Sequence, residues 1–369
     1  MLKVPFVLLY RSVYACTPPI LPSGDPTVCP FATQLKKNEC ARGGWYTNKE
    51  HRTVSTRESF FTIMALHNCK EDVAHIERYV HRLSEHMTSD GQVPWKFTET
   101  WSGTEVPHYT CNGKKVVDAN AQFLILLEWL HDTRSQTLKL LHLHARRAYQ
   151  WLETFMKNNA FYEESGSSWE NTIQHSGYVL LTNVLVCQSI RSMELICMSQ
   201  GEKKHQELMV KTHGHFIESL QKKLYTSQEV LPRMLAIYWN MLPVTFLKSY
   251  NQELRYPIPL ITPGPCAPST TWESWLYGTD DIHTRLVYPW IGFLWTLILF
   301  KTYKTEEAKK WWEYYGLFEK HSTLYNIYTP MNMKPVRRAF LQSCSGHSLS
   351  MAMFIAAKQF ADNHANSPQ

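Results

Sequence analysis

Apolar residues recur at intervals of three and four positions in two long segments, residues 73–87 and 138–155. This period places them along one face of an α-helix, so each segment is predicted to form an amphipathic helix with one buried side. Four further segments are apolar on nearly every side, and a helix without a polar face has to be enclosed by other helices. These enclosed segments are residues 121–130, 179–187, 290–300 and 348–357.

The alternation of one-sided and enclosed helices predicts an all-α protein in which an inner ring of helices is wrapped by an outer one. Strand signals are sparse, and no glycine-rich turn opens a βαβ unit. Residues 46–369 show no interdomain boundary and are expected to form one domain. Residues 1–45 are poorly patterned and are expected to be an N-terminal extension.

Long segments rich in Pro, Gly, Ser, Trp and Tyr precede the enclosed helices. Residues 89–117, 161–178, 255–289 and 322–345 are therefore predicted to be loops. Long loops that recur on the same side of successive helix pairs usually build a binding site. We expect a pocket at the end of the ring that carries these loops.

Composition excludes several classes of protein. Hydrophobic residues make up 44% of the chain and charged residues 19%, which is typical of a globular protein. The formal net charge of +6 is spread out, with no basic run longer than two residues, so no nucleic-acid surface is predicted. No phosphate loop, dinucleotide fingerprint or metal-ligand spacing is present, so no cofactor or metal is predicted. The sequence leaves the oligomeric state open.

Cysteine usage and the N-terminus bear on the location of the protein. The nine cysteines form no CxxC or CxxxC pair, which argues against a disulfide framework and indicates a reducing compartment, the cytoplasm. The apolar run after Lys3 could begin a signal peptide, so secretion is the alternative, but Arg11 interrupts it. No segment has the roughly 20 continuous apolar residues of a membrane span.

Asp118 is the strongest candidate for chemistry, since it stands directly before an apolar segment without another charge until Glu128. A carboxyl at the mouth of a buried helix is poorly solvated, and it can then hold the proton that a general acid needs. An aspartate in this place can equally be a helix N-cap. The local pattern leaves both interpretations open.

Several segments in this order resemble the (α/α)6-barrel glycoside hydrolases, which include glycogen debranching glucosidases, neutral invertases, trehalases and mannosylglycerate hydrolases. Residues 55–66, STRESFFTIMAL, resemble the Arg-Asp segment that enters the first barrel helix of this family, with Arg57 and Glu58 in place of Arg and Asp. Residues 89–97, SDGQVPWKF, resemble its next turn. The resemblance implies an (α/α)6 barrel, a six-hairpin toroid, and it maps the general acid of the family onto Asp118.

The resemblance continues through the second half of the chain. Residues 167–185 are similar to the Trp-x-Asp loop of the family and the helix after it, with Trp169, Glu170 and Asn183 matching. Residues 288–301 resemble its Trp-Pro-Trp helix entry, in which Trp290 matches. These matches imply that Arg57, Glu58 and the loop residues bind sugar. From the sequence alone, Arg57 and Glu58 can also be an exposed pair of helix-start charges.

One departure from the family concerns the general base. Residues 323–335, TLYNIYTPMNMKP, resemble the loop that supplies this glutamate, but the matching residue is Asn326. An amide cannot accept a proton from water at neutral pH. Asn326 could orient the water, Glu273 could replace the base with Asp280 or Asp281 behind it, or the barrel could bind sugar without cleaving it.

Indole rings are candidates for stacking on a pyranose, since its C–H face is apolar, although some rings will belong to the core. The tryptophans in or next to the expected mouth loops are Trp45, Trp95, Trp101, Trp169, Trp272 and Trp290.

The sequence thus predicts an inverting glycoside hydrolase that acts on an α-linked glucoside or small oligosaccharide, with Asp118 as acid and Glu273 as the best substitute base. The alternative, from a different class, is a catalytically inactive barrel that serves as a carbohydrate-binding or interaction module.

Overall fold

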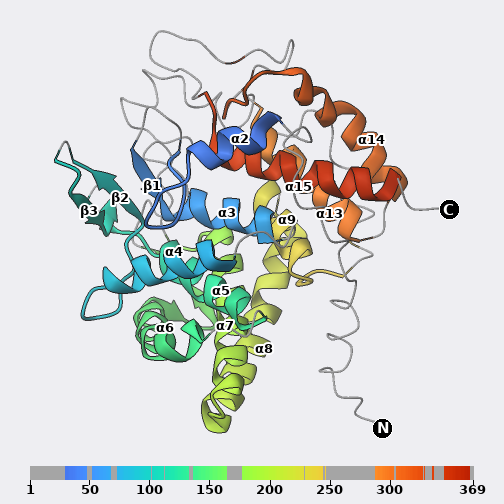
Figure 1. The fold of residues 1–369 in the computed structure, drawn as a ribbon. Helices are drawn as coiled ribbons and strands as arrows, with labels where there is room; N and C mark the ends of the chain where they lie inside the picture. Colours follow the sequence, from blue (N-terminus) through green and yellow to red (C-terminus); the bar gives the residue numbers. More distant parts are fainter. Residues whose placement is uncertain are drawn as a thin grey trace.

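A computed structural model describes most of the chain (Figure 1). The described residues are 30–47, 52–67, 73–100, 102–111, 113–132, 136–163, 177–227, 229–243, 246, 287–302, 305–326, 328, 335 and 345–365.

Six largely buried helices form a closed inner ring in the described part of the chain. In ring order each packs against the next, and the last packs against the first, which closes the ring. They are α3 (Thr56–His67), α5 (Asp118–Asp132), α7 (Leu180–Ser199), α9 (Val230–Tyr238), α13 (Pro289–Lys301) and α15 (Ser348–Ala365). The predicted inner ring is therefore confirmed, since α5, α7, α13 and α15 contain the four enclosed segments.

One-sided helices alternate with the ring helices along the sequence and lie outside the ring. They are α2 (Pro30–Lys37), α4 (Val73–Glu85), α6 (Thr137–Glu153), α8 (Lys203–Thr226) and α14 (Thr305–Tyr315), which a 3-10 turn, η1 (Gly316–Lys320), follows. The face predicted for α4 is buried at Ile76, Val80 and Leu83. Outer helices such as α6 and α8 pack against α7, so each covers the ring with its apolar face.

The segment 89–117 was predicted to be a loop, and this prediction is wrong in part. Strands β1 (Thr53–Ser55), β2 (Lys96–Glu99) and β3 (Glu105–His108) form an antiparallel sheet in that order. A further hairpin joins β4 (Thr110–Cys111) to β5 (Lys114–Lys115), and another joins β6 (Met156–Lys157) to β7 (Ala160–Phe161). These strands have two to four residues, so they are too short to show an alternating pattern in the sequence.

The N-terminal boundary also differs from the prediction, because α2 lies within residues 1–45. Phe31 on α2 is fully buried and meets Phe354 of α15 edge to face, with ring centroids 5.0 Å apart. The Asn38 amide donates to the Gly346 carbonyl at 2.8 Å and to Ser348 Oγ at 2.9 Å. Figure 1 shows α2 lying along α15, although the two helices come from opposite ends of the chain. Residues 30–45 thus pack against the outside of the helical ring.

One ring helix, α7, is long and apolar enough to cross a membrane when judged by length and composition alone. Most of its residues are buried between α5, α8 and α9. Its position inside the ring accounts for its apolar composition.

Gly292 allows α13 and α14 to approach closely. A Cβ atom added to Gly292 would lie 1.9 Å from the Tyr315 ring. Alanine normally stabilises a helix by about 1 kcal/mol over glycine. Here we expect Gly292→Ala to lower the free energy of unfolding by roughly 2 kcal/mol, because the added methyl group overpacks the interface. In a Tyr315→Leu background the same change should cost less, which a urea-unfolding double-mutant cycle measures; equal costs in both backgrounds would contradict the packing argument.

His67 lies at the end of α3, in contact with the neighbouring ring helix. Its imidazole stacks on Trp129 with centroids 5.2 Å apart, and burial, assisted by the charge of Lys301, lowers its pKa from 6.5 to about 4. Below pH 6.5 the unfolded state therefore takes up a proton that the folded state refuses. We expect a loss of stability on the order of 3 kcal/mol between pH 6.5 and 4 from this group. His67→Phe keeps the stacked ring and should be less sensitive to pH over this range, which thermal unfolding at several pH values measures. Parallel pH curves for the two proteins would count against this account.

Candidate functional site

The starts of three ring helices meet at one end of the ring. The Arg57 guanidinium at the start of α3 reaches Asp118 at the start of α5. At the start of α15, Ser348 Oγ donates to the Tyr46 carbonyl at 2.7 Å, and the Ser348 backbone N–H donates to the Thr47 carbonyl at 3.2 Å. Residues from distant parts of the sequence thus converge here, at the end predicted to carry the pocket.

Asp118 is the first residue of α5, and only 2% of its side chain is exposed. Its Oδ2 atom accepts a hydrogen bond from Arg57 Nε at 2.8 Å and a longer one from Gln122 Nε2 at 3.4 Å. No described residue donates a hydrogen bond to Oδ1, and no described backbone amide donates to either oxygen. The side chain is therefore held through one oxygen by an ion pair and is not used as a helix cap.

Asn120 fixes the start of α5 to the preceding turn. Its Oδ1 accepts from the Val93 backbone N–H at 2.9 Å, while its Nδ2 donates to the carbonyl oxygens of Gly91 at 2.8 Å and Ala148 at 3.2 Å. Gly91 has φ of +101°, and a Cβ there would lie 2.3 Å from the Arg147 carbonyl oxygen. This contact explains the glycine of the SDGQVPW segment and places Asp118, two residues before Asn120, at a fixed position.

Asn183 makes the equivalent contact on α7. Its Oδ1 accepts from the Phe161 backbone N–H at 2.9 Å, and its Nδ2 donates to the carbonyl oxygens of Phe161 and Val179. An asparagine near the start of a ring helix therefore anchors the preceding extended segment in two successive helix pairs.

Glu58 occupies the same end of the ring on the side of α15. Its Oε2 accepts a short hydrogen bond from Thr47 Oγ1, and its Oε1 lies 3.6 Å from His347 Nε2. Burial opposes the charge of Glu58, but His347, Thr47 and Arg57 outweigh this effect, and the pKa of Glu58 is lowered from 4.5. Glu58 is therefore an ionised carboxylate at neutral pH, and it remains partly exposed.

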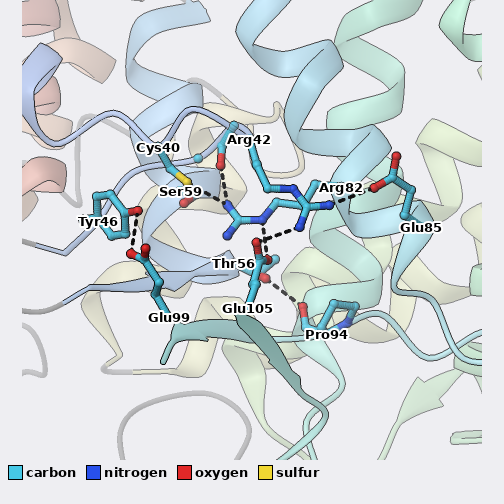
Figure 2. A network of polar contacts seen from close by, with 12 residues as sticks. Cys40, Arg42, Tyr46, Thr56, Ser59, Arg82, Glu85, Pro94, Glu99 and Glu105 are labelled. Carbon is cyan, nitrogen blue, oxygen red and sulfur yellow. Dashed lines mark hydrogen bonds and ion pairs between the residues drawn. The ribbon is translucent and has the colours of Figure 1, made fainter. Parts of the chain in front are cut away.

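Figure 2 shows a network of polar contacts around a buried arginine, Arg82, close to the segment that leads to Thr47. Arg82 of α4 donates to Glu105 Oε1 of β3 at 2.7 Å, to the Gly43 carbonyl and to Cys40 Sγ. Burial opposes the charge of Arg82, but Glu105 and its other neighbours raise its pKa. This network ties residues 40–43 to α4 and to the sheet, so Thr47 approaches Glu58 from a fixed segment.

Solved structures share this arrangement of helices. A GH63 mannosylglycerate hydrolase from Thermus thermophilus, in complex with glucose, superposes with a TM-score of 0.62 at 11% identity, over 88% of this chain and 98% of that one. A protein described as a wild-type glycosidase gives a TM-score of 0.63 at 12% identity, over 90% and 95%. This protein has the fold of the (α/α)6-barrel glycosidases.

A larger structure also contains this barrel. A rhamnosidase from Klebsiella oxytoca with rhamnose bound gives a TM-score of 0.61 at 12% identity, over 92% of this chain and 65% of that one. No protein-family model and no curated protein sequence matches the chain. The resemblance predicted from the sequence is thus confirmed at the level of the fold.

The barrel brings together only some of the predicted site residues. Arg57, Glu58 and Asp118 lie at the starts of α3 and α5. Asn326 follows Tyr325, which pairs with Ser345 shortly before α15, so it lies in the loop that leads to the last ring helix.

The three described tryptophans among the predicted sugar-binding residues have different surroundings. Trp45 is 6% exposed and packs on His75 with centroids 4.0 Å apart, and Trp290 is 3% exposed and lies against Phe61. Both rings belong to the core, so the described contacts give them no stacking face for a sugar. Trp95 is partly exposed, donates through Nε1 to the Thr110 carbonyl and lies under the Lys96 ammonium group.

Other predicted residues lie outside the described part of the chain, namely Trp101, Trp169, Glu170, Trp272, Glu273, Asp280 and Asp281.

Sequence reasoning missed three residues that contact the predicted ones: Gln122, Thr47 and His347. Gln122 stands four positions after Asp118, and this helical spacing could have revealed their contact. Thr47 and His347 are far from Glu58 in sequence, and no local pattern indicates that they meet it.

Proposed function

We propose that this protein is a glycoside hydrolase that cleaves an α-linked glucoside or small oligosaccharide with inversion, and that Asp118 is its general acid. The observation that supports this most strongly is the unequal use of the Asp118 oxygens. Arg57 and Gln122 bind Oδ2, whereas Oδ1 accepts no hydrogen bond from the described residues. Oδ1 is therefore the oxygen to which we assign the proton and the contact with the leaving group.

In this proposal Asp118 carries its proton when the glycoside binds, and Arg57 acts on the carboxylate that forms afterwards. When Oδ1 gives its proton to the glycosidic oxygen, the C1–O bond breaks and Asp118 becomes a carboxylate. The negative charge spreads to Oδ2, where the Arg57 guanidinium 2.8 Å away stabilises it. Arg57 thus favours the state that follows proton transfer.

Inversion also needs a base on the opposite face of the sugar, with the two carboxyl groups roughly 6.5–9.5 Å apart. We assign this role to Glu273, because Asn326 has no group that can take the proton of the attacking water. Glu58 is not assigned this role, because His347, Thr47 and Arg57 lower its pKa, which makes its carboxylate a weaker base.

The second candidate function is a barrel that binds sugar without cleaving it. The amide at Asn326, in the loop that leads to α15, favours this alternative. An ionised Glu58 and the Arg57–Asp118 pair offer acceptors and donors for hydroxyl groups whether or not a base is present.

A panel of sugars distinguishes the two functions. We expect turnover of at least one α-linked disaccharide or short α-glucan, with the released sugar in the inverted anomeric form by proton NMR. The panel includes rhamnosides and mannosylglycerate, because structures with this fold act on or bind such compounds. Glu273→Gln should abolish turnover and leave sugar affinity nearly unchanged. Affinity for glucose without turnover of any compound would support the binding barrel.

A further inference from the structure

The imidazole of His347 points its Nε2 atom toward Glu58, and the contacts of Nδ1 determine which nitrogen carries the ring proton. His347 stands directly before α15, and its Nδ1 accepts from the Ser350 backbone N–H at 3.3 Å, while Ser350 Oγ lies 2.9 Å from the same atom. A nitrogen that accepts a backbone N–H carries no proton, so the ring proton is on Nε2. Nε2 is the atom that lies 3.6 Å from Glu58 Oε1.

The constellation of Ser350, His347 and Glu58 has the order of a nucleophilic triad, but its surroundings exclude this use. Ser350 is fully buried, and so its hydroxyl group cannot attack a substrate. Glu58, in contrast, is partly exposed. A ligand can therefore reach the carboxylate of Glu58, and His347 contacts this carboxylate from the buried side.

We propose that His347 is a positioning residue that holds the Glu58 carboxylate at the end of the barrel, where it recognises an uncharged sugar through its hydroxyl groups. This inference rests on the proposed function, which it extends to the choice of substrate. Thr47 fixes one oxygen and His347 faces the other, so the carboxylate plane is set from two sides. A fixed anion accepts hydrogen bonds from hydroxyl groups and repels a carboxylate, so uronic acids should be excluded.

Among the described residues, Arg57 and His347 are the ionisable groups named as acting on Glu58. Arg57 is its neighbour on α3 and is engaged with Asp118, His347 approaches from the start of α15, and Thr47 is uncharged. A change in the pKa of Glu58 on substitution of His347 can therefore be attributed to the loss of the His347 contact.

Two substitutions separate positioning from helix capping. His347→Asn keeps an acceptor for the Ser350 N–H, since asparagine is a favoured N-cap, but it lacks the Nε2 donor. His347→Gln places an N–H group near the position of Nε2 and weakens the cap. If His347 only caps α15, His347→Gln should disturb the protein more than His347→Asn. If His347 positions Glu58, His347→Asn should change the titration of Glu58 and the sugar affinity more than His347→Gln.

The first readout is the titration of Glu58, followed by carbon-13 NMR of labelled protein and assigned with Glu58→Gln. We expect the Glu58 midpoint to lie below 4.5 in the wild type and in His347→Gln, and to move up in His347→Asn. Thr47→Val should also raise it and leaves α15 untouched. An unchanged midpoint in folded His347→Asn would overturn the positioning role.

The second readout is affinity for methyl α-glucoside and for its glucuronic acid counterpart, measured by calorimetry. We expect the wild type to prefer the neutral sugar by about tenfold or more, and His347→Asn to lose about tenfold in affinity for it, the effect of one charged hydrogen bond. A wild type that binds both sugars equally would overturn the recognition step. If neither sugar binds while the titration still depends on His347, the positioning contact stands and the proposed function fails.

Discussion

Asp118→Asn is expected to reduce kcat by about a thousandfold on a natural glycoside, within the range that general acid catalysis contributes. The amide keeps the shape of the side chain and can remain near Arg57, but it has no acidic proton for the leaving oxygen. On a substrate whose leaving group needs no proton, such as glycosyl fluoride, the loss should be much smaller. Steady-state kinetics on the two substrates measure this difference.

A matched carboxylate-to-amide change controls for nonspecific effects. Glu306 on α14 is exposed and pairs with Lys309, so Glu306→Gln should leave kcat and thermal stability unchanged. An Asp118→Asn protein that loses activity equally on both substrates would show that Asp118 binds or orients sugar and donates no proton. An Asp118→Asn protein that keeps full activity would remove Asp118 from the mechanism.

Asn120→Ala is expected to lower the free energy of unfolding by roughly 4 kcal/mol. Asn120 is fully buried, and its loss leaves the Val93 N–H and the Gly91 carbonyl without this partner, while the Ala148 carbonyl inside α6 keeps its helical hydrogen bond. Each unsatisfied buried group costs about 1–3 kcal/mol. Because the start of α5 would also lose its anchor, we expect turnover to fall more than stability alone explains. Urea unfolding and assays below the melting temperature measure the two effects.

Asn183→Ala provides the comparison for Asn120→Ala. It removes a similar set of hydrogen bonds at the start of α7, so it should cost a similar free energy. Leu140→Ala, at a position that is 70% exposed, should stay within about 0.5 kcal/mol of the wild type. A loss below about 1 kcal/mol for both asparagine variants would contradict the anchoring role.

The ring could be predicted from the sequence because enclosed helices have a distinct composition. The segment 290–300, for example, has no polar side, and α13 is buried all round. The same reasoning failed for residues 89–117, where each strand has four residues or fewer, and for α2, where eight residues give too few turns for a clear period.

Site residues could be predicted only where one short segment contains both an ionisable side chain and the start of an apolar helix. Asp118 stands out because it precedes an apolar helix, and Arg57 and Glu58 stand out at the start of another. His347 and Thr47 contact Glu58 only in the folded protein, because each belongs to a different segment of the chain from Glu58. Trp45 and Trp290 show the converse limit, because an indole that packs in the core and one that stacks on a sugar look alike in a sequence.

The most direct test of the central claim is a crystal structure with a non-hydrolysable thioglycoside of the best substrate from the panel. The quantity to measure is the distance from Asp118 Oδ1 to the sulfur that replaces the glycosidic oxygen. We expect the sugar to lie at the starts of α3, α5 and α15, with Oδ1 about 3–3.5 Å from this sulfur and Oδ2 still bound to Arg57. A ligand bound elsewhere, or one whose sulfur faces Arg57 while Oδ1 points away, would contradict the assignment of Asp118 as the proton donor.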